Sequence, residues 1–214
     1  MKKRQVLVLL ACSALLATAG CTGQPASDGP TDTGSWQAYR PELDRVARER
    51  MTAGNQNGRP ETLALLAQHG RAGWYLWRNT SDALCTAALT TDGGAVIRCR
   101  PSEGPGPVTG TRLQTVAEMT PIGYDHWALL VAADRGSVTA ASCGGRDLQV
   151  TPAGTDVLPS GVRRYYLVQS PWELAGKPVA QVLSDSGTET SAPLDVRAEP
   201  IGHGMPGQVC TAAS

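Results

Sequence analysis

Cysteine is the residue type in this 214-residue chain whose number and spacing point most directly to chemistry. Four of the six cysteines lie in the body of the chain, at Cys85, Cys99, Cys143 and Cys210. Four thiols could ligate a metal ion, or they could form two disulfides in an oxidising compartment. No two of them have the close spacing of zinc ligands, and the three histidines are scattered along the sequence, at His69, His126 and His203. We therefore predict two disulfides and no metal site.

The stretch LCTAALTTDGGAVIRC, residues 84–99, favours one of the possible pairings. It contains two β-rich runs on either side of an Asp-Gly-Gly turn, which is the pattern of a β-hairpin. A hairpin would bring its two ends together and place Cys85 beside Cys99. Cys143 would then pair with Cys210 and tie down a tail rich in Gly and Pro.

The N-terminal segment has the pattern of a secretory signal peptide. A positively charged start at residues 2–4 precedes an apolar run over residues 6–19, which is shorter than the roughly 20 residues of a membrane span. The run ends in TAGC, a tetrapeptide that resembles the bacterial lipobox, although the lipobox usually has Leu where this chain has Thr18. The alternative is an ordinary signal peptide with an incidental cysteine. We predict a lipoprotein signal peptide over residues 1–20 and lipidation of Cys21.

A diacylglycerol on Cys21 would anchor the protein in the lipid bilayer of the cell membrane, at its extracytoplasmic face, because two acyl chains give stable anchoring. No Val, Ile, Leu, Met or aromatic residue follows Cys21 as far as residue 35. Residues 21–35 are therefore expected to be a flexible tether, with a reach of roughly 20 Å. Removal of residues 1–20 leaves 19 − 3 = 16 basic against 19 acidic residues, a net charge of −3. This charge indicates no nucleic-acid partner.

Residues 36–214 are expected to form an extracytoplasmic, mainly β domain. An amphipathic helix is predicted over residues 40–51, and residues 61–69 fit either a second short helix or an edge strand. Short predicted strands then follow at 74–79, 84–90, 95–100, 112–118, 127–132, 138–143, 148–151, 162–169, 179–184 and 189–194. This spacing favours a disulfide-linked β-sandwich-like domain. A subdivision of the domain is possible near residues 120–125.

The sequence contains no pattern typical of the common hydrolases or nucleotide-binding enzymes, such as G-x-S-x-G, H-E-x-x-H or a glycine-rich phosphate loop. The segment ASCGGRD places Cys143 near glycines, as in cell-wall transpeptidases, but Ala141 and Ser142 stand where those enzymes have His-Gly. A disulfide is therefore the favoured role of this cysteine. Asp125 and His126 would point to opposite faces of a strand, at its solvated start. We predict a non-enzymatic protein with no catalytic residues and no cofactor.

The stretch GWYLWRN, residues 73–79, is apolar on both faces if it forms a strand. Aromatic residues in such a strand usually lie in the core. The alternative is that Tyr75 and Trp77, which share one face, form an exposed surface platform for a glycan or a partner protein. The adjacent Arg163 and Arg164 of RRYYL are expected at a solvated edge, and the alternative is that they form a recognition site.

The lipobox-like motif, the polar tether and the size of the following domain resemble those of actinobacterial cell-envelope lipoproteins, in particular the CseA-type regulators that accompany a stress sigma factor and a sensor kinase. The resemblance implies that a membrane sensor kinase is a partner. It also implies a role in modulating the response of that kinase to envelope damage, or in stabilising the cell envelope. The alternative function is binding of an envelope glycan or other ligand, or assistance to a wall hydrolase, with Tyr75 and Trp77 as the binding platform.

Overall fold

The computed structural model describes residues 36–54, 56–101, 111–122, 126–158, 161–202 and 206–211. The predicted signal peptide, Cys21 and the predicted tether lie outside these residues, as do Asp125 and His203. The described part consists mainly of β-strands with one α-helix ahead of them and two disulfides, as predicted.

The helix α2 (Arg40–Thr52) follows a 3-10 turn, η1 (Gln37–Tyr39). Pro41 stands in the first turn of α2, where its missing N–H leaves no helical hydrogen bond unmade. The apolar stripe of the helix is fully buried and consists of Leu43, Val46, Ala47 and Met51. The predicted amphipathic helix is therefore confirmed, with its apolar side packed on a sheet.

Four antiparallel strands form the first sheet, in the order β1-β2-β3-β4. Their bounds are β1 (Ala64–His69), β2 (Ala72–Arg78), β3 (Leu84–Thr90) and β4 (Ala95–Arg100). The ambiguous segment 61–69 contains the end of a 3-10 turn, η2 (Pro60–Thr62), and then the edge strand β1. The β3–β4 hairpin has its predicted bounds, and Gly93, at φ 88°, supplies the left-handed backbone in its turn.

Strand β2 is covered on both faces. Tyr75 and Trp77 are 1% and 0% exposed and pack with the apolar side of α2. Trp74 and Leu76, on the other face, belong to the apolar cluster shared with the second sheet. The interpretation of this stretch as core is confirmed, and the exposed platform of Tyr75 and Trp77 is wrong because α2 covers that face.

Seven strands form the second sheet, in the order β12-β11-β7-β8-β9-β6-β5. Their bounds are β5 (Arg112–Pro121), β6 (Trp127–Asp134), β7 (Gly136–Cys143), β8 (Arg146–Leu158), β9 (Gly161–Ser170), β11 (Val179–Ser184) and β12 (Glu189–Pro193). The long strand β8 pairs first with β7 and then with β9, so two parts of the sheet pack over a shared apolar core. Near its edges, Thr115 Oγ1 donates to the Asp195 carbonyl at 2.9 Å. This sheet, packed on itself and on the first sheet, gives the predicted sandwich-like fold.

Two further strands, β10 (Leu174–Gly176) and β13 (Gln208–Cys210), form a small parallel sheet that the sequence did not predict. Each has only three residues, which is too short for a recognisable alternation of apolar and polar side chains.

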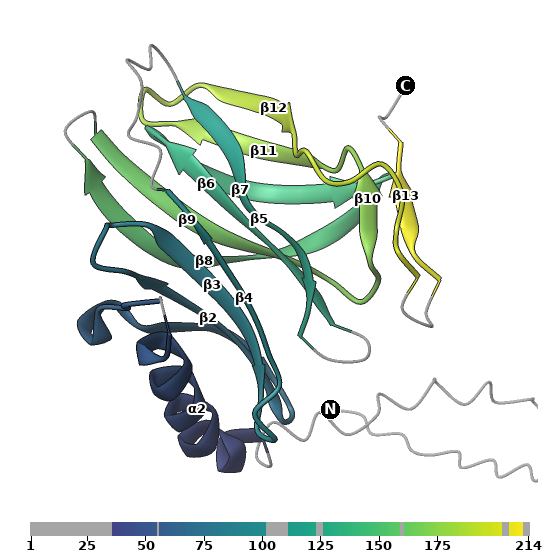
Figure 1. The fold of residues 1–214 in the computed structure, drawn as a ribbon. Coiled ribbons are helices and arrows are strands. Elements are labelled where there is room, and N and C mark those ends of the chain that lie inside the picture. Colours follow the sequence, from purple (N-terminus) through teal and green to yellow (C-terminus); the bar gives the residue numbers. More distant parts are fainter. Residues whose placement is uncertain are drawn as a thin grey trace, which may run out of the picture. The chain divides into compact units, whose positions relative to one another are not determined.

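Figure 1 shows the layers of the domain: α2, then the four-stranded sheet, then the curved seven-stranded sheet. The change of sheet falls between β4 and β5. The predicted subdivision near residues 120–125 is therefore misplaced, because β5 and β6, on either side of that point, are paired neighbours in one sheet.

Candidate functional site

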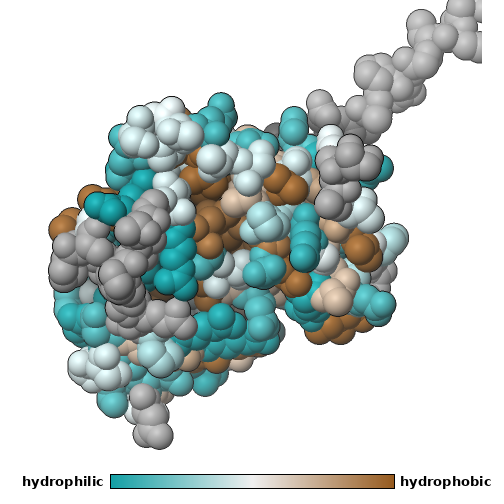
Figure 2. All heavy atoms as spheres, turned by 90° about the horizontal axis from the view of Figure 1, so that it is seen from above, coloured by the Kyte–Doolittle hydropathy of each residue, from teal (hydrophilic) through white to brown (hydrophobic). Residues whose placement is uncertain are grey.

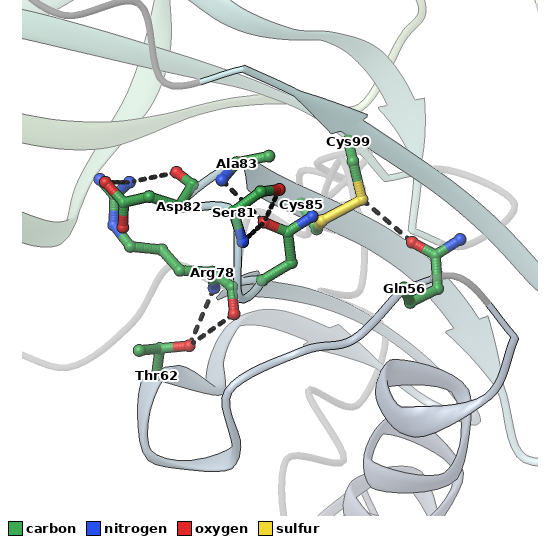
Figure 3. Close-up of a disulfide and its surroundings, with 9 residues drawn as sticks. Gln56, Thr62, Arg78, Ser81, Asp82, Ala83, Cys85 and Cys99 are labelled. Carbon is green, nitrogen blue, oxygen red and sulfur yellow. Dashed lines mark hydrogen bonds and ion pairs between the residues drawn. A yellow bond between two sulfur atoms is a disulfide. The ribbon is translucent and has the colours of Figure 1, made fainter.

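The first disulfide, Cys85–Cys99, ties β3 to β4 at directly paired positions. Cys85 is 0% exposed, in the cluster beneath α2, whereas Cys99 is exposed on the edge strand β4. Figure 3 shows this bond together with Gln56, whose Oε1 lies 3.0 Å from Cys99 Sγ. The pairing predicted from the hairpin is confirmed.

The turn between β2 and β3 lies beside this disulfide and is held by side-chain hydrogen bonds (Figure 3). Asn79 Oδ1 accepts from the backbone N–H groups of Ser81 and Ala83, at 3.0 and 2.8 Å. Thr62 Oγ1 accepts from the N–H of Arg78 at 2.8 Å. These contacts fix the backbone at the end of β2, where Arg78 stands, and so fix the point from which the Arg78 side chain extends.

Charged side chains form a row across three neighbouring strands of the second sheet. Asp134 of β6 and Asp156 of β8 are both register partners of Arg163 of β9. Arg163 donates from Nε and Nη2 to the Asp134 carboxylate at 2.6 and 2.9 Å, and the two side chains are only 6% and 7% exposed. The hydrogen bonds to Asp134 raise the pKa of Arg163 above its already high value. The solvated edge predicted for Arg163 is wrong, because strand pairing brings a carboxylate to each side of it.

The row continues into the first sheet through an ion pair between Arg78 and Asp156. Tyr165 Oη donates to the same Asp156 carboxylate at 2.6 Å. Burial raises the pKa of Tyr165, and the hydrogen bond to Asp156 raises it further. The phenol therefore keeps its proton at neutral pH and acts as a donor. The positive charges of the two guanidinium groups, Arg78 and Arg163, equal the negative charges of the two aspartates in the row. The row therefore joins the two sheets without a net charge.

A cavity of about 220 Å³ lies beside this charged row. Arg163 and Tyr165 line it together with Gln114, and Arg100 and Leu84 contribute from the first sheet. The four cysteines of the described residues are all in disulfides, so none of them offers a thiolate to this cavity. The arrangement can hold a small polar molecule by hydrogen bonds, and its ionised groups are already matched with one another.

The second disulfide, Cys143–Cys210, joins the end of β7 to the C-terminal strand β13. Its two residues are 1% and 4% exposed. The chain leaves Cys143 through Gly144 and Gly145, whose φ angles of 56° and 78° give a tight hairpin turn into β8. The second predicted pairing is confirmed, and the resemblance of this segment to a catalytic thiol motif has a structural cause: the glycines make the turn.

Two of the histidines that are scattered in sequence meet in space. His69, at the end of β1, stacks on His126 with ring centroids 4.0 Å apart, and Trp36 packs against His69 at 4.5 Å. His126 directly precedes β6, at the strand start where it was predicted, but it is half-buried rather than solvated. Among the residues that the structure describes, no group of three or more His, Cys, Asp or Glu side chains could hold a metal ion.

No protein-family model matches this chain, and no curated protein or solved structure is significantly similar to it. Within the described ranges, no helix is long and apolar enough to cross a membrane. The sequence features and the described fold are therefore the basis for a functional proposal.

The partners of Arg163 and Tyr165 were not predicted from the sequence. Asp134 directly follows the uninterrupted apolar run 127–133, and the adjacent Arg163 and Arg164 precede the apolar run 165–168 of β9. An acidic residue after one apolar run and a basic residue before another would meet if the two runs paired as antiparallel strands. This pattern was the available signal for the ion pair. Asp156 gave no such signal, because it stands in a polar part of the sequence.

Proposed function

We propose that this protein is a lipid-anchored lipoprotein on the extracytoplasmic face of the cell membrane, without enzymatic activity, that modulates an envelope-stress sensor kinase or stabilises the cell envelope. The observation that carries the proposal is the order of features along the chain. A lipobox-like TAGC motif precedes a polar segment, and a domain with two disulfides begins at Trp36.

The disulfides support the compartment in this proposal. Four cysteines are paired in the described domain, and disulfides persist in oxidising compartments outside the cytoplasm. The lipid on Cys21 would then hold the domain at the outer surface of the membrane.

The tether supports a weak interaction with a membrane partner. A flexible segment over residues 21–35 would let the domain move within roughly 20 Å of its anchor. Such confinement raises the effective concentration toward a receptor in the same membrane, so a low-affinity interface is sufficient.

The surface of the domain is consistent with such an interface. Figure 2 shows apolar surface divided into several patches among polar side chains on the face seen from above. The large apolar side chains that are more than half exposed stand on separate segments: Val96 on β4, Val157 on β8, Ile201 after β12 and Val209 on β13. The glycan platform of Tyr75 and Trp77 is not available for the alternative function, because both side chains are core.

The test of anchoring is metabolic labelling with a clickable fatty acid in the native host. Wild-type protein is expected to incorporate the label and to fractionate with membranes. Cys21→Ala is expected to lose both properties. Cys12→Ala, which changes a cysteine within the predicted signal peptide, is the matched control and is expected to retain them. Label that persists in Cys21→Ala contradicts the anchoring site.

The test of partnership is cross-linking in living cells, followed by purification from membranes and mass spectrometry. A sensor kinase captured by the wild type and lost from Cys21→Ala supports the regulatory role. Recovery of wall fragments with no membrane protein enriched contradicts that role.

A further inference from the structure

A groove of about 510 Å³ lies beside the Cys143–Cys210 disulfide. Three segments far apart in sequence form it: the β7–β8 turn, the turn after β9 that contains Trp172, and the segment 206–211 with β13. The disulfide links the first segment to the third, and the β10–β13 pairing links the second to the third. Gln208 Nε2 also reaches the Cys143 carbonyl, at 3.5 Å. The groove is therefore held in shape by a covalent bond and a strand pair.

Arg146 is positioned by the tight turn that precedes it. It is the register partner of Cys143, and directly paired residues lie on the same face of a hairpin, so Arg146 lies beside the disulfide. Its guanidinium stands over the Trp172 ring, with Cζ 5.5 Å from the ring centroid. A cation–π contact leaves N–H donors of the guanidinium free to bind an anion.

No nearby carboxylate of the described residues neutralises the positive charge of Arg146. Among the residues that the structure describes, no carboxylate forms an ion pair with Arg146. Asp147 follows it in the strand, where successive side chains point to opposite faces. Glu173, next to Trp172, is 2% exposed, and its carboxylate faces Arg197 at 3.5 Å and the N–H of Gly202 at 3.2 Å. The groove thus presents one positive charge beside an indole.

We propose that this groove binds a sugar that carries a carboxylate. The carboxylate would pair with Arg146, as guanidinium groups do with planar anions. The C–H face of the sugar ring would pack on Val209, which is 51% exposed, and on the part of the Trp172 indole that the Arg146 guanidinium does not cover. The hydroxyls would meet the polar groups of Gln208 and Thr211. A volume of about 510 Å³ is within the range of known ligand sites. This inference goes beyond the proposed function and does not depend on the anchor or on a kinase.

The test is calorimetric titration of the full-length protein in a zwitterionic detergent. The probe is a hyaluronan tetrasaccharide, in which glucuronate alternates with N-acetylglucosamine, and the neutral counterpart is chitotetraose. Because a charge-assisted contact is lost with the neutral sugar, we expect chitotetraose to bind at least about 10-fold more weakly. A short polyglutamate provides carboxylates without a sugar ring and is expected not to compete.

Three variants separate the groove from the rest of the surface. Arg146→Gln is expected to weaken hyaluronan binding about 10-fold and to abolish the preference over chitotetraose. Trp172→Ala is expected to weaken both sugars, and Trp36→Ala, which removes a half-buried indole outside the groove, is the matched control with wild-type binding. Thermal unfolding of each variant is measured alongside, and if Trp172→Ala does not fold, Arg146→Gln decides the result.

Equal affinities of the wild type for the two sugars would overturn the proposal, as would unchanged binding in Arg146→Gln. Competition by polyglutamate as strong as that by hyaluronan would show a general anion site and overturn the assignment to a sugar. The absence of heat with either sugar at millimolar concentration would also overturn it.

Discussion

The two disulfides differ in what they add to the structure. Cys85–Cys99 spans 14 residues and joins two strands that a complete hairpin ladder already holds together. Cys143–Cys210 spans 67 residues and joins a hairpin to a tail that pairs through the three-residue strand β13. The first bond reinforces a contact that the backbone makes by itself. The second creates a contact that few hydrogen bonds would maintain, and a surface groove depends on it.

The entropy of closing the two loops also predicts a larger contribution from the Cys143–Cys210 bond. Closing the unfolded chain at these separations stabilises the folded state by about 3 kcal/mol for the hairpin bond and about 4 kcal/mol for the tail bond. The difference in structural consequence is expected to exceed this difference in energy, because the hairpin persists without its disulfide and the tail does not.

The largest effect is expected from the double change Cys143→Ala with Cys210→Ala. The free energy of unfolding should fall by about 4 kcal/mol, because the tail regains its freedom in the unfolded chain. Amide hydrogens of β10 and β13 should lose their protection from exchange, and hyaluronan binding should disappear. Urea unfolding, hydrogen exchange and calorimetric titration measure the three effects. A tail that remains protected would show that the strand pair, and not the disulfide, holds it.

A smaller effect is expected from Cys85→Ala with Cys99→Ala. The loss should be at most about 3 kcal/mol, and the amides of β3 and β4 should stay protected, because their ladder and the packing of α2 remain. The same two measurements apply. If this variant loses more stability than the tail variant, the comparison is reversed, and the buried Cys85 side of the bond contributes packing that the ladder cannot replace.

The same contrast explains which parts of the structure could be predicted from the sequence. The β3–β4 hairpin and the helix α2 are local, so a turn motif and an apolar stripe were sufficient to place them. The pairing of Cys143 with Cys210 followed by elimination once Cys85 and Cys99 were paired. The row from Asp134 to Arg78 and the meeting of His69 with His126 depend on strand register and sheet packing, which no local pattern encodes. Tyr75 was ambiguous because an apolar strand face looks the same whether a helix covers it or a ligand does.

The four-stranded and the seven-stranded sheet each contain a buried tyrosine with a raised pKa. The contributions of these two tyrosines to stability can therefore be compared at high pH. Tyr75 Oη donates to Asp44 at 2.8 Å beneath α2, and Tyr165 Oη donates to Asp156 at 2.6 Å in the second sheet. Burial is the main cause of both shifts from the ordinary value of 10.0, and the hydrogen bond to a carboxylate adds to each. Above that pH the unfolded chain releases these protons while the folded protein retains them. Stability from the two groups is thus complete below about pH 10 and is lost as the pH rises beyond it.

The smallest predicted effect is that of Tyr75→Phe and Tyr165→Phe. Each should cost about 1 kcal/mol at pH 8, because one hydrogen bond is lost and a partly exposed carboxylate loses a donor. Each should also make the fall in stability above pH 10 shallower than in the wild type, since one linked proton is removed. Urea unfolding from pH 8 to pH 11, with short incubation to spare the disulfides, measures both terms. The two tyrosines lie in separate apolar clusters, so the double variant should show the sum of the two changes in slope. A slope that changes for Tyr165 alone would mean that the α2 layer opens before the second sheet, and that the domain unfolds in two steps rather than one.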